Sequence, residues 1–263
     1  MESLKINLSN TSNTRSLSTL VNQKGEHIKN NLLIRSDALN HIEENDIFVL
    51  SNQYKLKRII DFRCDNEVLA EPDQLIPNTE YFHYPVLPNE RVGITRKGSD
   101  EKNFEDFIKT LHENGIQSSI NFMSKVYEEL VDPFANEGYK KFLHVLLEPV
   151  DGATLWHCSA GKDRAGFATI LILYILDFDL DTIINDYLDT NHYYQKKIDQ
   201  YTKLYGKEYY QILKTLFGVN KQYILVLFKK IEEVYGGMDL YITNILDITL
   251  EKKEKLRRIY LGE

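Results

Sequence analysis

The sequence predicts an α/β fold in which a small, mostly parallel sheet is flanked by helices. Two observations predict it: short strand-like runs alternate with helical periods over the first 160 residues, and the pattern of the final third is almost wholly helical. The 263 residues are 43% hydrophobic, which is enough to bury one substantial core. We therefore expect a single domain covering residues 1–263.

Four runs have the length and composition of short strands, at residues 32–35, 56–62, 81–86 and 154–157. Residues 119–130 and 139–147 carry apolar side chains at helical spacing, and residues 167–176 are apolar throughout, as in a buried helix. Helical patterning resumes at residue 182. The polar, charged segment 93–103 is typical of a surface loop.

Residues 193–217 are rich in tyrosine and lysine. Two interpretations stay open for this segment. A tyrosine-bearing helical pair could close over a pocket as a lid subdomain, or the tyrosines could be core contacts of a packed C-terminal helix.

The run HCSAGKDRAG at residues 157–166 is the most informative motif. It lies between the predicted strand 154–157 and the predicted helix 167–176, so Cys158 and Arg164 stand at the two ends of a tight loop. Strand, small loop and helix form an anion-binding geometry, because backbone N–H groups can converge on one point at the positive end of the helix dipole.

Each residue type in this loop suits phosphoryl chemistry. The positive field favours the thiolate form of Cys158, which is the nucleophilic form. Arg164 can hold two phosphoryl oxygens in a bidentate fork. The expected phosphate-binding residues are those whose backbone curls round the anion, Ser159, Ala160, Gly161, Lys162, Asp163 and Arg164. Gly161 allows the tight turn and close approach.

Other classes of protein fit this loop less well. A nucleotide-binding P-loop needs a glycine where Trp156 stands and a Ser or Thr where Asp163 stands. Two alternatives remain open: a module that binds phosphate groups without turnover, and a sulfur-transfer or arsenate-reducing enzyme that uses the same cysteine loop.

The run resembles the H-C-x-A-G-K-D-R-[T/S]-G signature of bacterial tyrosine-phosphatase-like enzymes that act on proteins and phosphoinositides. Three more segments resemble stretches of that family in the same order, LIRSDAL at 33–39, IIDFR at 59–63 with Glu67 beyond it, and YGGMDLYI at 235–242. The segment NTRSLS at 13–18 follows the family's opening loosely. The resemblance implies a cysteine-phosphatase fold, hydrolysis of phosphotyrosine or phosphoinositide monoesters through a thiophosphoryl enzyme, and no metal or other cofactor.

One departure bears on the mechanism. Ala165 stands where most of these enzymes have a Ser or Thr, so the hydroxyl that would hydrogen-bond the departing thiolate is missing. Since a hydrogen bond to a charged group contributes about 1.5–3 kcal/mol, hydrolysis of the phosphoenzyme is expected to slow by roughly ten- to a hundredfold at most.

Phosphoryl transfer also needs a proton donor for the leaving group. The resemblance implies a catalytic role for the loop carboxyl, so Asp163 is the first candidate and Asp61, at the end of a predicted strand, is the second. Asp61 could instead be structural and hold Arg63 or the loop backbone, and an acid on a remote lid is a further alternative.

Three further side chains, two of them in the motif, each have a specific predicted role. Lys162, a second cation at the loop, favours substrates with extra phosphates, unless it faces solvent or pairs with Asp61. His157 is expected to hydrogen-bond loop carbonyl groups as a scaffold residue. Cys64 is a candidate to trap oxidised Cys158 as a disulfide, although a buried inert cysteine is the commoner outcome.

Charge and hydropathy limit the partners. The net charge of −7 argues against nucleic acid and against broad adhesion to anionic membranes, so any lipid contact would be local. No apolar run is long enough to span a bilayer, and the N-terminus lacks a basic region followed by an apolar one. We expect a cytoplasmic protein, or one secreted without a recognisable N-terminal signal.

Overall fold

The computed structural model describes residues 4–89 and 101–262, with side chains in the second range from residue 104 onward. Residues 93–100 of the predicted surface loop lie outside the described residues. The last three residues of that prediction already belong to helix α3 (Glu101–Glu113), so the predicted loop extends too far.

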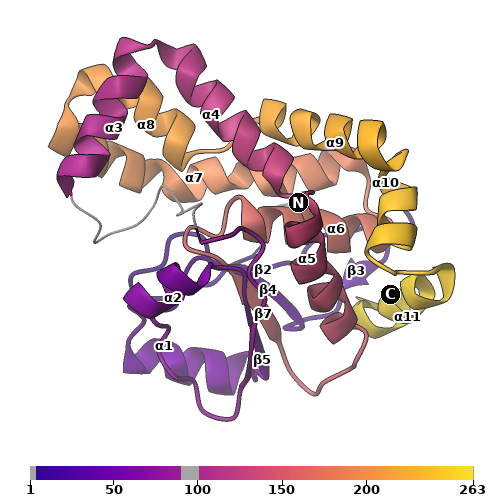
Figure 1. Cartoon of the computed structure of the whole chain (residues 1–263). Helices are drawn as coiled ribbons and strands as arrows, with labels where there is room; N and C mark the ends of the chain where they lie inside the picture. The colour runs from indigo at the N-terminus through magenta and orange to yellow at the C-terminus, as the bar shows by residue number, and fades with distance from the viewer. Residues whose placement is uncertain (1–3, 90–100, 263) are drawn as a thin grey trace.

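A six-stranded sheet with the order β1-β2-β4-β7-β5-β6 lies at the centre of the molecule (Figure 1). Strands β4, β7, β5 and β6 are mutually parallel, whereas β1 and β2 add an antiparallel edge. The strands are β1 (Leu4–Lys5), β2 (Arg15–Ser16), β4 (Leu33–Ser36), β5 (Arg58–Asp61), β6 (Glu80–His83) and β7 (Thr154–His157). The four predicted strands are the four parallel ones, and β3 (His27–Ile28) pairs with β8 (Leu261–Gly262) as a separate ribbon.

Neighbouring residues of one strand point to opposite faces of the sheet, so each strand contributes side chains to two cores. Ile34 and Leu155 pack in a core with helix α1 (Glu44–Phe48) and the following π-helical turn (Val49–Gln53). Trp156 packs in the larger core on the other face, which helices α5 (Pro133–Leu146) and α6 (Arg164–Ile175) help to form. This confirms the α/β fold with helices flanking a mostly parallel sheet.

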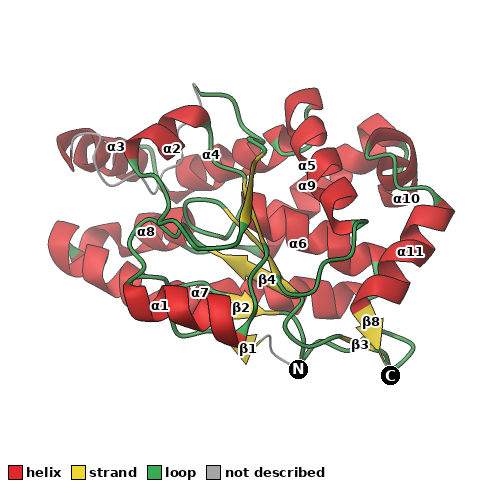
Figure 2. Cartoon of the chain, turned by 90° about the horizontal axis from the view of Figure 1, so that it is seen from below, coloured by secondary structure: helices red, strands yellow, loops and turns green. Residues whose placement is uncertain are grey.

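The rest of the chain is mostly helical, and in Figure 2 helices surround the central strands, whereas β3 and β8 lie at the edge of the view. Helix α2 (Asp65–Ala70) follows β5, and α4 (Ile116–Glu129) corresponds to the predicted helix 119–130. The final third contains α7 (Leu180–Tyr205), a 3-10 turn (Lys207–Tyr209), α8 (Tyr210–Phe217), α9 (Lys221–Tyr235), α10 (Met238–Leu240), a π-helical turn (Tyr241–Ile245) and α11 (Leu250–Tyr260). Within the described residues, no helix has both the length and the apolar character to cross a membrane.

Helices α3, α4, α7 and α8 gather at one end of the molecule, at the top of Figure 1. Aromatic side chains join them. Tyr201 stacks on Phe217 and on Tyr205, and the edge of Phe104 on α3 meets both tyrosines. Tyr201 and Tyr205 therefore make core contacts within this helical group, and a lid formed by residues 193–217 stays a prediction.

Candidate active site

The HCSAGKDRAG run forms a loop at the carboxyl end of the central strand. Cys158 directly follows β7, and Arg164 is the first residue of α6. Because β7 pairs with β4 on one side and β5 on the other, the loop lies in the middle of the sheet edge. Cys158 is buried beside the N-terminus of α6, where the helix dipole is positive.

Hydrogen-bond donors outside the loop hold its carbonyl groups. The Ala160 oxygen accepts from Asn13 Nδ2 at 3.2 Å and from Tyr194 Oη at 2.9 Å, and the Gly161 oxygen accepts from Asn13 Nδ2 at 2.9 Å and Arg35 Nη2 at 2.7 Å. In a trans peptide the next N–H points the opposite way from the carbonyl. The N–H groups that follow these two carbonyls therefore turn away from the external donors, as an anion nest requires.

Gly161 has a backbone requirement of its own. Its φ is +63°, and a Cβ added there would lie 2.3 Å from the carbonyl oxygen of Ser36. Both the left-handed conformation and the close approach to β4 exclude a side chain. The glycine that the sequence favoured for a tight turn is thus required by sterics.

Arg164 forms a bidentate ion pair with Glu67 of α2. Nη1 lies 2.5 Å from one carboxylate oxygen and Nη2 lies 2.9 Å from the other, and Glu67 also accepts from Ser159 Oγ and the Cys64 N–H. Burial opposes ionisation of Glu67, but the charge and hydrogen bonds of Arg164 outweigh it and lower its pKa to about 2. Among the described residues no hydrogen bond engages Arg164 Nε, which leaves that edge of the guanidinium available to a bound anion.

A buried charge network supports the loop from behind. Asp186 of α7 accepts from Arg15 Nε at 3.2 Å and from Arg35 Nη1 at 2.8 Å, and Arg35 also binds the Gly161 carbonyl. Burial, helped by the neighbouring Arg15, lowers the pKa of Arg35 to about 10, yet the group stays charged at neutral pH. Burial opposes ionisation of Asp186 as well, but the two arginines lower its pKa.

Asp163 lies in the loop with its side chain partly accessible. Its Oδ1 accepts from Tyr127 Oη at 2.6 Å, and Lys162 Nζ lies 2.9 Å from each carboxylate oxygen. Lys162 itself is buried, and its Nζ also lies 3.4 Å from the carbonyl of Gly218, just after α8. The lysine therefore pairs with Asp163 beneath the helical group, and neither faces solvent nor pairs with Asp61.

Asp61 is fully buried, and its carboxylate is hydrogen-bonded by side chains inside the fold. It accepts from Arg63 Nη2 at 2.7 Å and from Tyr81 Oη at 2.7 Å. Burial opposes its ionisation, but His157 and Arg63 outweigh that effect and hold the pKa of Asp61 well below its usual range. A carboxyl that stays ionised and surrounded by donors fits the structural interpretation of Asp61, since it has no proton to give to a leaving group.

His157 does not hydrogen-bond the loop carbonyls as expected. Its ring is directed to the carboxylates behind the strand, with Nε2 at 2.9 Å from Asp73 and 3.8 Å from Asp61. Burial by itself lowers the pKa of His157, but the two carboxylates raise it by more than burial lowers it. The pKa of His157 is therefore above its ordinary value. A metal ion could be held by the same three side chains. However, Arg63 lies 3.0 Å from Asp73, so protonated His157 with Arg63 already balances the two negative charges.

Cys64 is a buried free thiol that caps α2 next to Glu67. Burial raises the pKa of its thiol, which keeps it protonated. Capture of oxidised Cys158 by Cys64 stays a prediction.

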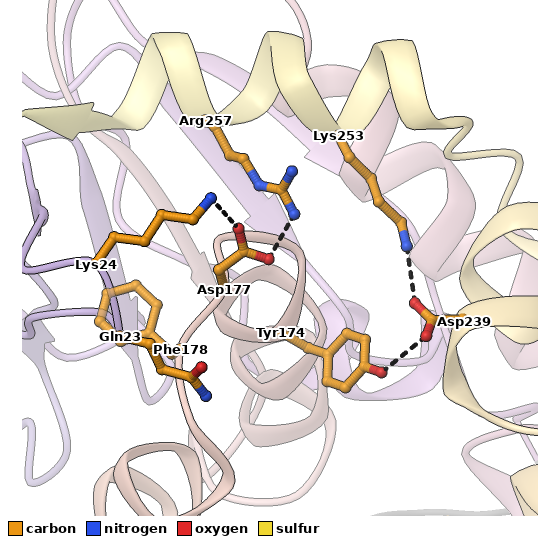
Figure 3. Close-up of a pocket in the computed structure, with 8 residues that line it drawn as sticks. All are labelled: Gln23, Lys24, Tyr174, Asp177, Phe178, Asp239, Lys253 and Arg257. Atoms are coloured by element: carbon orange, nitrogen blue, oxygen red, sulfur yellow. Dashed lines mark hydrogen bonds and ion pairs between the residues drawn. The ribbon is translucent and has the colours of Figure 1, made fainter.

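A pocket of about 450 Å³ lies at the far end of α6 from the loop (Figure 3). Its charged groups are engaged in ion pairs: Asp177 pairs with Lys24 and Arg257, and Asp239 pairs with Lys253. No loop residue lines it.

A sequence model of the tyrosine phosphatase family matches residues 6–262. The chain belongs to the tyrosine phosphatase family. Among curated members, the triple specificity protein phosphatase PtpB of Mycobacterium tuberculosis is 23% identical over 88% of this chain and 91% of its own length. A Cupriavidus necator protein with a provisional tyrosine-protein phosphatase name is 25% identical over 95% of this chain and 86% of its own length. The protein is thus a protein-tyrosine-phosphatase-like hydrolase, as its loop motif predicted.

No local sequence pattern predicted a role for the residues that hold the loop at 158–164. Arg35, Glu67 and Asn13 lie in segments that resemble the family, and that was the only signal for them. Four more supporting residues lie on helices that are distant from the loop in sequence, and no local motif marks them. They are Tyr127, Tyr139, Asp186 and Tyr194.

Proposed function

We propose that this phosphatase hydrolyses phosphotyrosine in proteins through a covalent thiophosphoryl intermediate on Cys158. The observation that carries the proposal is the phosphatase loop itself. Its carbonyl groups are bound from outside, and it sits between a buried cysteine and an arginine at the start of α6. Inward N–H groups, a helix N-terminus and a guanidinium together suit a dianionic phosphoryl group.

The first chemical step is attack on phosphorus. Cys158 Sγ forms a bond to phosphorus while the bond to the phenolic oxygen breaks, and Asp163 donates a proton to that oxygen. The free edge of Arg164 binds the equatorial oxygens, with Glu67 fixing the guanidinium plane. In the second step water attacks phosphorus and gives a proton to the Asp163 carboxylate, and the S–P bond breaks to release inorganic phosphate and the Cys158 thiolate.

Ala165 makes the second step the slow one. A hydroxyl at this position would hydrogen-bond the departing sulfur, and Ala165 is fully buried beside Cys158 without one. The phosphoenzyme therefore accumulates during turnover.

Phosphoinositides are the second substrate class. Lys162 supports it, because this ammonium lies beside Asp163 in the loop and could bind an additional phosphate. A bisphosphorylated headgroup would have to replace the Asp163 and Gly218 contacts of Lys162. Closure of α7 and α8 over the substrate belongs to the same proposal, and it is supported by the contacts of Tyr194 and Gly218 with the loop.

The test is phosphate release from phosphotyrosine peptides, phosphoserine peptides, and mono- and bisphosphorylated phosphoinositides, with Cys158→Ser as the control. We expect release from phosphotyrosine that is lost in Cys158→Ser. Release from phosphoinositides alone would replace the protein substrate by the lipid. Tight binding with no release from any substrate would identify a phosphate-binding module. Turnover that depends on arsenate or a sulfur donor would identify a sulfur-transfer or arsenate-reducing enzyme.

A further inference from the structure

A chain of buried hydroxyl groups ends on Asp163. Tyr127 of α4 donates to Asp163 Oδ1 at 2.6 Å, and the hydroxyl groups of Tyr127 and Tyr187 of α7 lie 2.6 Å apart. Both tyrosines are 1% exposed. Two helices that are remote from the loop in sequence therefore converge on its carboxyl group.

The direction of this chain follows from counting protons. Tyr127 has a single hydroxyl proton and gives it to Asp163, so Tyr187 must be the donor to Tyr127. The backbone of Asn220 in turn hydrogen-bonds the Tyr187 hydroxyl. The donors are thus aligned toward Asp163, and the chain ends on its Oδ1.

We infer that Tyr127, backed by Tyr187, is a positioning residue for the proton donor of the reaction. This rests on the proposed function, in which Asp163 protonates the leaving group. By holding Oδ1, Tyr127 fixes the rotation of the carboxyl group.

Other titratable groups also lie near Asp163. Lys162 and Arg164 belong to its own loop, Tyr139 comes from α5, Tyr194 from α7 and Tyr223 from α9. Burial raises the pKa of Tyr127 well above its ordinary value, with Asp163 and Tyr187 adding to the effect, so Tyr127 remains a neutral donor over the working pH range.

Tyr223 offers a matched control. Its ring packs on Tyr127 with centroids 5.2 Å apart and it is equally buried, but none of the described contacts joins its hydroxyl to Asp163. Tyr223→Phe removes a hydroxyl from the same aromatic cluster and leaves the chain to Asp163 intact.

The experiment measures kcat and kcat/KM for Tyr127→Phe, Tyr187→Phe and Tyr223→Phe on two substrates. The two substrates are phenyl phosphate, whose leaving group needs a proton, and 4-nitrophenyl phosphate, whose more acidic phenol needs it less. For Tyr127→Phe we expect kcat/KM on phenyl phosphate, which reports the first step, to fall roughly tenfold, with a smaller change on the nitrophenyl ester. Because the second step limits kcat, kcat should change less than kcat/KM on either ester.

The remaining variants make the outcome decisive. Tyr187→Phe should lower kcat/KM on phenyl phosphate by less, and it provides the answer if Tyr127→Phe does not fold. Tyr223→Phe should keep the wild-type values on both esters. If the wild type shows Cys158-dependent turnover and neither Tyr127→Phe nor Tyr187→Phe lowers kcat/KM on phenyl phosphate, this assignment alone is overturned. Equal losses on both esters would reduce Tyr127 to a packing residue, and absence of Cys158-dependent turnover in the wild type would overturn the proposed function itself.

Discussion

Replacing Glu67 by Gln removes the negative charge that pairs with Arg164 while keeping the shape of the side chain. Glu67 is 5% exposed, and the pair lowers its pKa from an ordinary 4.5 to about 2. At about 1.4 kcal/mol for each pKa unit, the ionised carboxylate contributes roughly 3 kcal/mol to the free energy of unfolding at pH 7. A buried arginine left without its partner has a cost of the same order.

The pH dependence has a definite sign. Because the folded-state pKa of Glu67 is depressed, its contribution is complete above about pH 4.5 and is lost as the pH falls through about 2. Wild type and Glu67→Gln should therefore differ by roughly 3 kcal/mol at pH 7, and the two should converge as the pH falls toward 2.

Urea denaturation at several pH values, with the slope m compared between the two proteins, measures this difference. Asp65→Asn is the control, since Asp65 lies on the same helix with an exposed side chain and should change stability by no more than about 0.5 kcal/mol. A Glu67→Gln difference that stays constant from pH 7 down to pH 3, or one that is no larger than the control's, would refute the reasoning.

Three further predictions concern the scaffold. Gly161→Ala places a Cβ against the Ser36 carbonyl, and it should destabilise the fold by about 1–3 kcal/mol and abolish turnover, as denaturation and phosphate-release assays would show. Asp186→Asn leaves two buried arginines without their countercharge and should cost about 3–5 kcal/mol in urea unfolding, whereas a change below about 1 kcal/mol would contradict the charge network. The pKa of His157 is raised in the folded state, so its stabilising contribution is full below about pH 6.5 and is lost as the pH rises through the folded pKa. Unfolding free energies measured upward from about pH 6 should fall in wild type and not in His157→Gln.

The hydrophobic pattern of the sequence was sufficient to predict those helices and strands that are determined by residues adjacent in sequence. The strand at 154–157, the loop after it and the apolar helix α6 were all predictable, because burial on both faces of a parallel strand gives a continuous apolar run. The two-residue strands β1 and β2 were not, since their residues are fixed by tertiary contacts. Arg15, for example, is directed to Asp186, 171 residues away.

The same division applies to the site. The loop residues Cys158 and Arg164 are adjacent to a recognisable strand and helix, whereas the donors that orient the loop come from distant segments. His157 shows the limit of local reasoning. Its position next to Cys158 suggested a contact with the loop, but strand alternation directs its side chain to Asp73 behind the sheet edge.

The most direct test of the central claim is the pre-steady-state time course of phenol release from an aryl phosphate, followed in wild type, Cys158→Ser and Ala165→Ser. The account predicts a burst equal to the enzyme concentration in wild type, with one phosphoryl group on Cys158 in the quenched protein. The burst should be absent in Cys158→Ser. In Ala165→Ser the burst should shrink and the steady-state rate should rise, by roughly ten- to a hundredfold at most, because the new hydroxyl can assist the departing thiolate. Two results would contradict this mechanism. One is wild-type turnover that shows no burst and has the same rate in Ala165→Ser. The other is phosphate release that survives in Cys158→Ser.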